Sequence, residues 1–361
     1  MFVYLTVMLL CCVFLYTMRN NSNKILPLAI TFALIWIMIT LQEGWGGDHT
    51  AYVYYFDLFN GQSLSDLLSG DDHGAIGYKF LLSIMPTEHF AMSFGMAIWC
   101  FAFAFLFYHF IPQKWWFLAI IFVFLDRAIM MGAISSYFRM AIAQSFLVFA
   151  FYSRVKGKKW WLFVLLVLCG SLFHKSVALL MLPLVFIKPA QSKITSSTMV
   201  GAIALLTIVT ILSPSSWINL VESIILGSDE LSEYAYYLED QEATSVKGVS
   251  LIVLFYWIYL LAQQVNKSNL TPTEYLVLKL ALVRIVFDIL PAVGLSTRFF
   301  YYIDIYFFAG MMVLFYRLPK KDTNKWFLFF SLMLIFWFFG YRVYASSAFF
   351  REHWATYNLI F

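Results

Sequence analysis

Charged residues are scarce in this chain. Only 12% of its 361 residues are Asp, Glu, Lys or Arg, whereas 62% are hydrophobic and 20% are aromatic. Soluble domains carry about 25% charged residues, so the composition excludes a water-soluble protein. Backbone polar groups cannot stay unpaired in lipid, and long apolar runs do not fit the alternating pattern of barrel strands. The sequence therefore predicts an all-α polytopic membrane protein.

Several motifs of soluble enzymes are also missing from the sequence. No nucleotide-binding glycine loop, zinc-ligand spacing or nucleophile elbow is present. The cysteines all lie within apolar runs, and their spacing indicates neither a metal site nor a disulfide framework; they are Cys11, Cys12, Cys100 and Cys169. We therefore expect no cofactor, no metal ion and no nucleic-acid partner. The first apolar run lacks a basic leader, and Arg19 follows it, which favours a retained helix with an external N-terminus.

Hydropathy predicts one integral membrane domain over residues 1–361, with about twelve transmembrane or re-entrant helices. The predicted limits are 2–18, 25–42, 88–110, 115–131, 136–153, 160–173, 175–187, 198–213, 248–265, 273–291, 298–316 and 326–343. The runs 160–173 and 175–187 are shorter than a full span. They are either two tilted helices or a hairpin that enters the membrane without crossing it.

Lysine and arginine are almost absent from the two longest segments between the predicted passes. Segments 43–88 and 214–247 each contain seven acidic residues against one lysine, Lys79 and Lys247 respectively, whereas the opposite loops all carry Lys or Arg. Because positive charges concentrate in cytoplasmic loops, both large loops and both termini are predicted to be periplasmic. The first loop opens with glycines, and a run of aromatic residues follows them between Tyr52 and Phe59. Residues 216–243 are predicted to form amphipathic helices on the membrane surface.

Four ionisable residues are predicted to share the outer side of the membrane. Arg139 opens the helix predicted at 136–153, and a basic loop ends that helix. The next apolar run returns and breaks just before His174 and Lys175. A second arginine, Arg298, stands at the outer start of the pass 298–316. Two guanidinium groups on one side favour a diphosphate site, and the alternative is that each arginine reaches lipid headgroups or a loop acid.

Other outer residues have a chemical and a structural interpretation. His174 can donate, accept or transfer a proton, or it can be a hydrogen-bonded structural residue. Asp48 and His49 form a solvated turn, or Asp48 accepts a proton from a hydroxyl group or orients one.

Charged residues also occur near other predicted passes. Arg284 and Asp288 are four positions apart, a spacing that favours a structural ion pair within one helix. Arg127 is a candidate for the same outer cavity as Arg139. Asp304 is placed to orient Arg298.

Four short segments carry a resemblance to a known family. They are Gly47-Asp48-x-x-x-Tyr52, Arg139-x-Ala141-Ile142-Ala143, the region His174-x-Ser176 with Ala178, and Arg298-x-x-Tyr301. In this order, they resemble the EpsG-type polysaccharide polymerases, a family that includes many Wzy O-antigen polymerases. The family's Glu-x-Gly-aromatic motif is matched by residues 75–78, Ala-Ile-Gly-Tyr, without the acid. Asp71 or Asp72 is the alternative acid.

The resemblance implies a glycosyltransferase on the periplasmic face of the bacterial inner membrane. Such enzymes polymerise oligosaccharide repeat units of O-antigen or a related polysaccharide, carried on undecaprenyl diphosphate. Donor, acceptor and membrane lipids are the implied partners, and a chain-length regulator protein is a further candidate.

The resemblance also implies roles for individual residues. Arg139 and Arg298 would bind the diphosphate. His174 would donate to the diphosphate or act as the base, with Asp48 as the competing base. The expected substrate contacts are Lys175, His49, Tyr52, Arg127, Arg284 and Tyr301.

Two other functions remain open. A lipid-linked oligosaccharide flippase would have charges in both membrane halves and an inverted repeat, whereas here the charges gather on the outer side. An O-antigen ligase, which transfers finished polymer, is poorly separated from a polymerase by sequence.

Overall fold

The computed structural model describes residues 2–41, 49–69, 75–125 and 138–174, with residues 177, 270–274, 276–277, 280, 305, 308–310 and 312–313. All regular secondary structure in these residues is helical, and they contain no strand. The chain divides into two compact units, Met1–Val185 with Phe339–Phe361, and Phe186–Phe338. The amphipathic helices predicted over residues 216–243 lie outside the described residues. They stay a prediction, as does the single membrane domain over residues 1–361.

In the second unit, a reciprocal cap marks the start of a helix. The amide of Glu274 donates to Thr271 Oγ1 at 3.2 Å, and the amide of Thr271 donates to Glu274 Oε2 at 2.9 Å. This pairing satisfies two amides that the first helical turn leaves without partners. It places a helix start at the N-terminal limit of the predicted pass 273–291.

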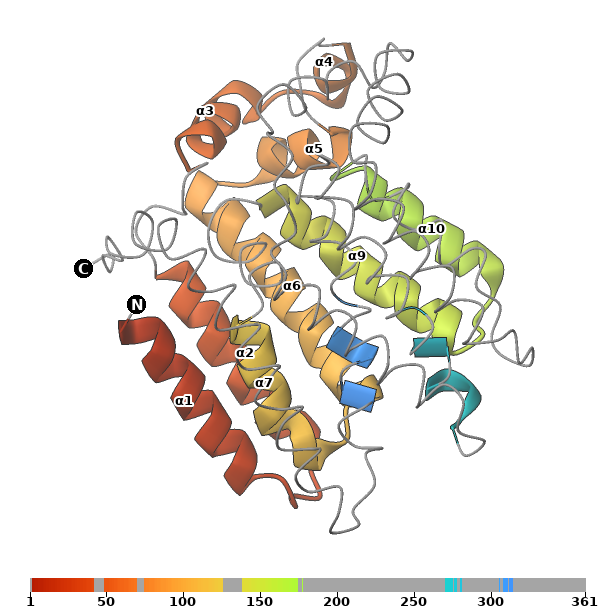
Figure 1. Cartoon of the computed structure of the whole chain (residues 1–361). Helices are drawn as coiled ribbons and strands as arrows, with labels where there is room; N and C mark the ends of the chain where they lie inside the picture. The colour runs from red at the N-terminus through yellow and green to blue at the C-terminus, as the bar shows by residue number, and fades with distance from the viewer. Residues whose placement is uncertain are drawn as a thin grey trace, which may run out of the picture. The chain divides into compact units, whose positions relative to one another are not determined.

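The long apolar helices of the first unit run alongside one another (Figure 1). They are α1 (Phe2–Thr17), α2 (Ile25–Thr40), α6 (Glu88–Phe110), α7 (Trp116–Leu125, preceded by the 3₁₀ turn Gln113–Trp115), α9 (Phe138–Val155) and α10 (Trp160–Ser171). Among the described residues, α6 is the helix whose length and composition suit a membrane crossing, and the other apolar helices are shorter. The helix limits agree with the predicted passes to within two residues, except at the end of the pass 115–131, which lies outside the described residues. The number of crossings stays a prediction.

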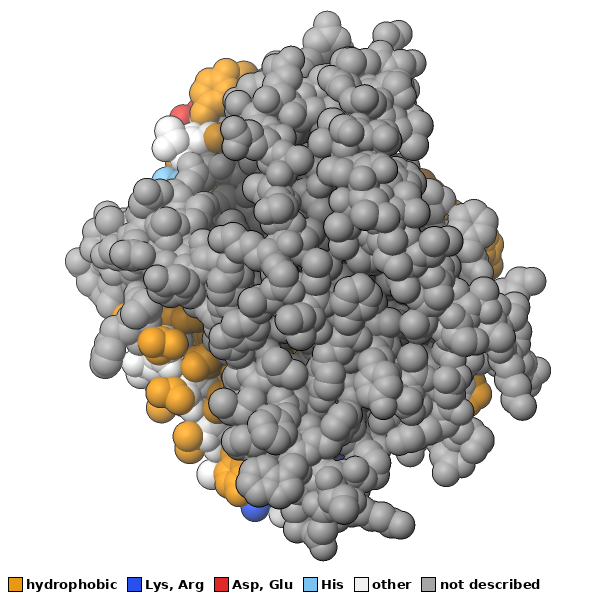
Figure 2. All heavy atoms as spheres, in the orientation of Figure 1, with side chains coloured by type: hydrophobic (Ala, Val, Ile, Leu, Met, Phe, Trp, Pro, Cys, Tyr) orange, Lys and Arg blue, Asp and Glu red, His pale blue; other side chains and the backbone are white. Residues whose placement is uncertain are grey.

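Hydrophobic side chains cover the outside of α1. Leu9, Leu10 and Val13 are all more than half exposed. Figure 2 shows hydrophobic side chains along the edge of the molecule that α1 occupies in Figure 1. An apolar surface of this kind suits contact with lipid chains.

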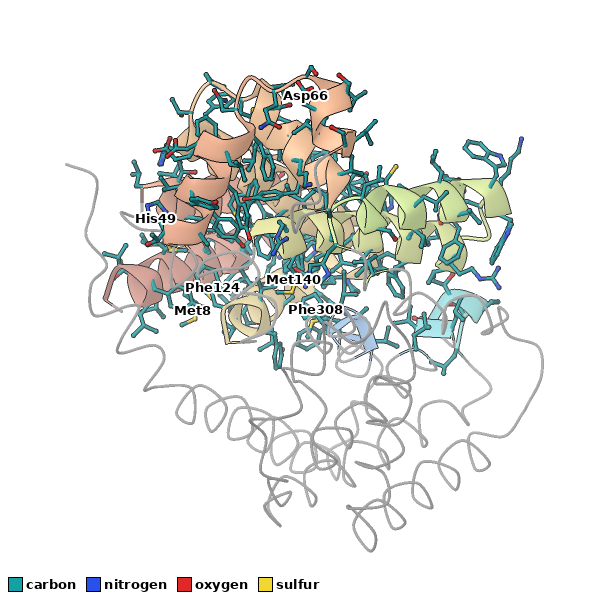
Figure 3. All side chains as sticks on the ribbon, turned by 90° about the horizontal axis from the view of Figure 1, so that it is seen from above. Met8, His49, Asp66, Phe124, Met140 and Phe308 are labelled. Atoms are coloured by element: carbon teal, nitrogen blue, oxygen red, sulfur yellow. The ribbon has the colours of Figure 1, made fainter. Side chains whose placement is uncertain are left out.

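The predicted first loop is itself helical. It contains α3 (His49–Phe59), α4 (Leu64–Ser69) and α5 (Ile76–Ile84). These three helices lie at the end of the first unit where α6 and α9 begin (Figure 1). Figure 3 looks from this end, with His49 marking the first turn of α3 and Met140 the first turn of α9. The Asn60 side-chain amide donates to the carbonyls of Leu82 and Met85, so the end of α3 is tied to the end of α5.

Hydrogen bonds connect the long helices. Trp36 Nε1 of α2 donates to the Ser93 carbonyl of α6 at 2.9 Å, and Trp99 Nε1 of α6 donates to Gln144 Oε1 of α9 at 2.8 Å. Trp99 and Gln144 are fully buried. Lipid chains are as apolar as Leu side chains, so polar contacts and close packing define which helices meet in a membrane.

A glycine allows α6 to approach the first turn of α9. A Cβ atom at Gly95 would lie 2.2 Å from Phe138 Cε2 and 2.8 Å from Phe138 Cζ. No larger residue fits at position 95 unless the Phe138 ring moves. The Phe138 ring can therefore occupy this position only because residue 95 is a glycine, which has no side chain.

We expect Gly95→Ala to lower the free energy of unfolding by about 1–3 kcal/mol, because the added methyl group overpacks the contact. Thermal unfolding of the purified protein measures this change. In a Phe138→Leu background the same substitution is expected to cost less, because the two nearest ring atoms are gone. An equal cost in both backgrounds would show that the Phe138 ring is not the obstacle.

Candidate functional site

Arg139 lies in the first turn of α9, where it is partly buried. No acidic residue occurs in this turn. The amino end of a helix carries a positive partial charge, which favours anions and disfavours cations. The first turn of α9 therefore provides no negative charge to offset Arg139. The arginine charge and the positive end of the helix add together, and their combined potential suits an anionic ligand.

The Arg139 side chain lies over the face of a tyrosine. Its guanidinium carbon is 5.4 Å from the centroid of the Tyr78 ring, which belongs to α5. Tyr78 is only 1% exposed. Its ring centroid lies 6.0 Å from that of Tyr52, 5.9 Å from that of Phe138 and 6.3 Å from that of Tyr55. We call these four rings the aromatic cluster; it brings α3, α5 and α9 together beside Arg139.

The Tyr78 phenol is neutral. Burial raises the pKa of Tyr78 well above its usual value, the Tyr52 and Tyr55 phenols raise it further, and the nearby Arg139 charge opposes this only in part. Among the described residues, the Tyr78 hydroxyl has no hydrogen-bond partner. The contact with Arg139 is therefore a cation–π interaction with a neutral ring.

Tyr52 supports the start of α9. Its hydroxyl oxygen accepts a hydrogen bond from the backbone N–H of Phe138 at 3.1 Å. Phe138 is the first residue of α9, and the first amides of a helix lack partners within the helix. Sequence reasoning placed Tyr52 among the substrate contacts. The structure shows this helix contact, and the substrate role stays a prediction.

A close backbone contact joins α5 to the end of α10. The Gly77 N–H donates to the Leu172 carbonyl at 2.8 Å, and a Cβ atom at Gly77 would lie 2.9 Å from both Leu172 Cβ and this oxygen. His174 follows two residues later, partly buried, and its N–H donates to the Gly170 carbonyl at 3.1 Å. Two adjacent residues of α5 thus make these contacts: Tyr78 contacts Arg139, and Gly77 contacts the segment that leads to His174. This arrangement agrees with the prediction that Arg139 and His174 share one end of the α9–α10 hairpin.

The other end of that hairpin is basic. The Arg154 guanidinium carbon lies 5.3 Å from the Trp160 ring centroid, and Gly157, at a φ of 62°, forms the turn between the helices. Arg139 and Arg154 are 15 residues apart on α9, or about 22 Å at the rise of an α-helix. The two arginines therefore mark opposite ends of one helix.

His49 and Lys79 are two further polar residues, one in α3 and one in α5. His49 is partly buried at the start of α3, and among described residues its Nδ1 has no hydrogen-bond partner. Burial lowers the pKa of His49; Glu88 opposes this effect and His89 adds to it. A lowered pKa favours the neutral imidazole. Lys79 is 4% exposed, with its ammonium 5.2 Å from the Phe59 ring centroid.

Sequence reasoning missed Gly77 and Tyr78 as site residues. The available signal was the Gly-aromatic pair of the family motif, which is present here although the acid is not. Other predicted site residues lie outside the described residues, and their roles stay predictions; they are Asp48, Arg127, Lys175, Arg284, Arg298 and Tyr301.

We expect Tyr52→Phe to lower the free energy of unfolding by about 1–3 kcal/mol, because it removes the acceptor of a buried backbone N–H. Tyr54→Phe is the matched control on the same helix, since Tyr54 is 63% exposed. Thermal unfolding of both variants in detergent measures the difference. If Tyr52→Phe has the same melting temperature as the control and the unchanged protein, the hydrogen bond does not stabilise the start of α9.

A comparison with protein-family models matches residues 25–359 to the EpsG family. Comparisons with curated proteins and with solved structures find no match. The family match spans nearly the whole chain and confirms the resemblance seen in the sequence. The chain belongs to the EpsG family and is thus a membrane protein of polysaccharide biosynthesis.

Proposed function

We propose that the protein is a polysaccharide polymerase, a glycosyltransferase that joins repeat units carried on undecaprenyl diphosphate. The EpsG family match supports the general class of function. The observation that carries the specific proposal is the position of Arg139, in the first turn of α9 with no acid in that turn. We place the reaction on the periplasmic face of the bacterial inner membrane, with both termini on that side.

A diphosphate provides the charge that this position lacks. Guanidinium groups form paired hydrogen bonds with phosphate oxygens, and the positive end of α9 adds to the attraction. Negative charge grows on the diphosphate as it departs, so a fixed guanidinium stabilises the transition state more than the bound substrate. Arg298 is the second proposed phosphate ligand.

The proposed reaction is one displacement. The bond between the anomeric carbon of the growing glycan and its diphosphate oxygen breaks. A hydroxyl oxygen of the incoming lipid-linked unit forms the new bond to that carbon, and its proton passes to a base. Undecaprenyl diphosphate is the leaving group. The donor is already activated, so no nucleotide is consumed.

Two residues are candidates for the base. His174 lies three residues beyond α10, at the end of the hairpin where Arg139 stands in the first turn of α9. It can take the hydroxyl proton, or it can donate to the diphosphate. Asp48 is the competing base. The remaining proposed substrate contacts are His49, Tyr52, Arg127, Lys175, Arg284 and Tyr301, and a chain-length regulator is the proposed protein partner.

We expect Arg139→Ala and His174→Ala each to abolish long polymer in cells that depend on this protein. Loss of one group that stabilises developing charge lowers turnover by about 100-fold or more. Arg139→Lys is also expected to fail, because an ammonium group cannot make the paired contact. Gel analysis of glycan length, at matched protein levels, is the measurement.

The control for this series is Arg154→Lys, the same substitution at the opposite end of α9. Its chain lengths are expected to equal those of the unchanged protein. Long polymer in both alanine variants would contradict the assignment of Arg139 and His174.

Deletion of the gene separates the three candidate functions. Loss of a polymerase leaves single repeat units on the final acceptor, and this is the expected result. Polymer retained on the carrier lipid would instead identify a ligase. Absence of both products would identify a flippase, and either of these results contradicts the proposal.

A further inference from the structure

We propose that Gly77 and Tyr78 are positioning residues, which hold the Arg139 guanidinium in place relative to His174. This inference rests on the proposed function, in which Arg139 binds a diphosphate. It assigns a task to α5, a helix of the first outer loop, and to the Gly-aromatic pair at positions 77 and 78.

The first step concerns Arg139 itself. A long, flexible side chain loses rotamer entropy when it is fixed, and at the start of α9 the helix dipole opposes a fixed cation. The Tyr78 ring, 5.4 Å from the guanidinium carbon, offers the negative face of its π-system. The ring thus fixes the cation without neutralising it. An acid in the same place would instead compete with the phosphate.

The second step concerns the ring. Tyr78 is 1% exposed, and the rings of Tyr52 and Phe138 meet it at steep angles of 69° and 63°. Tyr52 also accepts the hydrogen bond from the first amide of α9. The ring therefore has little freedom to turn, and the helix that carries Arg139 is tied to the same cluster.

The third step concerns α5 as a whole. The Gly77 amide donates to the Leu172 carbonyl at 2.8 Å, and a Cβ atom at Gly77 would lie 2.9 Å from that oxygen. Glycine permits this approach of two backbones. Gly77 therefore sets the distance between α5 and the segment that leads to His174, and Tyr78 sets the distance between α5 and Arg139. The short helix α5 therefore helps to fix the position of Arg139 relative to His174.

The task belongs to the ring and not to the hydroxyl. Among the described residues the Tyr78 hydroxyl has no hydrogen-bond partner, and a buried group without a partner reduces stability. Tyr78→Phe is therefore expected to keep the affinity for diphosphate and to keep or raise the melting temperature.

The test measures binding of undecaprenyl diphosphate, and of undecaprenol as a probe without phosphates, to the full-length protein in nanodiscs. Tyr78→Met is expected to weaken diphosphate binding by about tenfold, a typical loss for a buried cation–π contact. Undecaprenol binding is expected to stay the same. In an Arg139→Ala background, Tyr78→Met is expected to have no further effect, because the residues act through one group.

One matched variant and one series of ring analogues complete the design. Phe80→Leu changes an aromatic residue of the same helix that is 47% exposed, and it is expected to leave both affinities unchanged. Phenylalanine analogues with one, two or three ring fluorines at position 78 preserve the shape of the ring and weaken its negative face. They are expected to lower diphosphate affinity stepwise, and this series remains decisive if Tyr78→Met does not fold.

The possible failures can be told apart. If Arg139→Ala does not weaken diphosphate binding, the proposed function is wrong. If Arg139→Ala weakens binding but the Tyr78→Met effect is additive with it, or fluorination has no effect, the positioning role is wrong. Loss of diphosphate binding in Tyr78→Phe would show that the hydroxyl group, and not the ring, is required, and this result would also overturn the inference.

Discussion

The contact between the Arg139 guanidinium and the face of the Tyr78 ring is the interaction on which the end of the first unit formed by α3, α5 and the start of α9 depends. It places a permanent cation at the positive end of a helix, where no acid of that turn compensates for it. The ring stabilises the cation without neutralising it. Under the proposed function, the Arg139 charge and the positive end of α9 together attract a diphosphate.

Close packing at two glycines supports that contact. Because Gly95 has no side chain, the Phe138 ring packs directly on α6. Because Gly77 has none, the Leu172 carbonyl lies close to the backbone of α5. Neither glycine forms a turn; each allows two helices to come nearer than a side chain would permit. The aromatic cluster fills the space between α3, α5 and α9, so a small shift at either glycine would reach Arg139 through packed rings.

The long helices could be predicted closely from sequence because local signals mark their ends. The pass predicted at 88–110 coincides with α6, since Thr87 accepts a hydrogen bond from the Phe90 amide at 3.1 Å and Pro112 follows the helix. The shared end of Arg139 and His174 followed from two apolar runs and the basic turn between them. The contacts of Tyr78 with Arg139 and of Tyr52 with Phe138 could not be predicted, because the partners are 61 and 86 residues apart. Such pairings depend on how α3 and α5 fold over the hairpin, and hydrophobic periodicity contains no information about that arrangement.

The most direct measurement is an electron cryomicroscopy structure of the full-length protein with undecaprenyl diphosphate bound. The account predicts diphosphate oxygens within hydrogen-bond distance of the Arg139 guanidinium, with the Tyr78 ring still against the same group. A diphosphate bound at a place that Arg139 does not contact would contradict it.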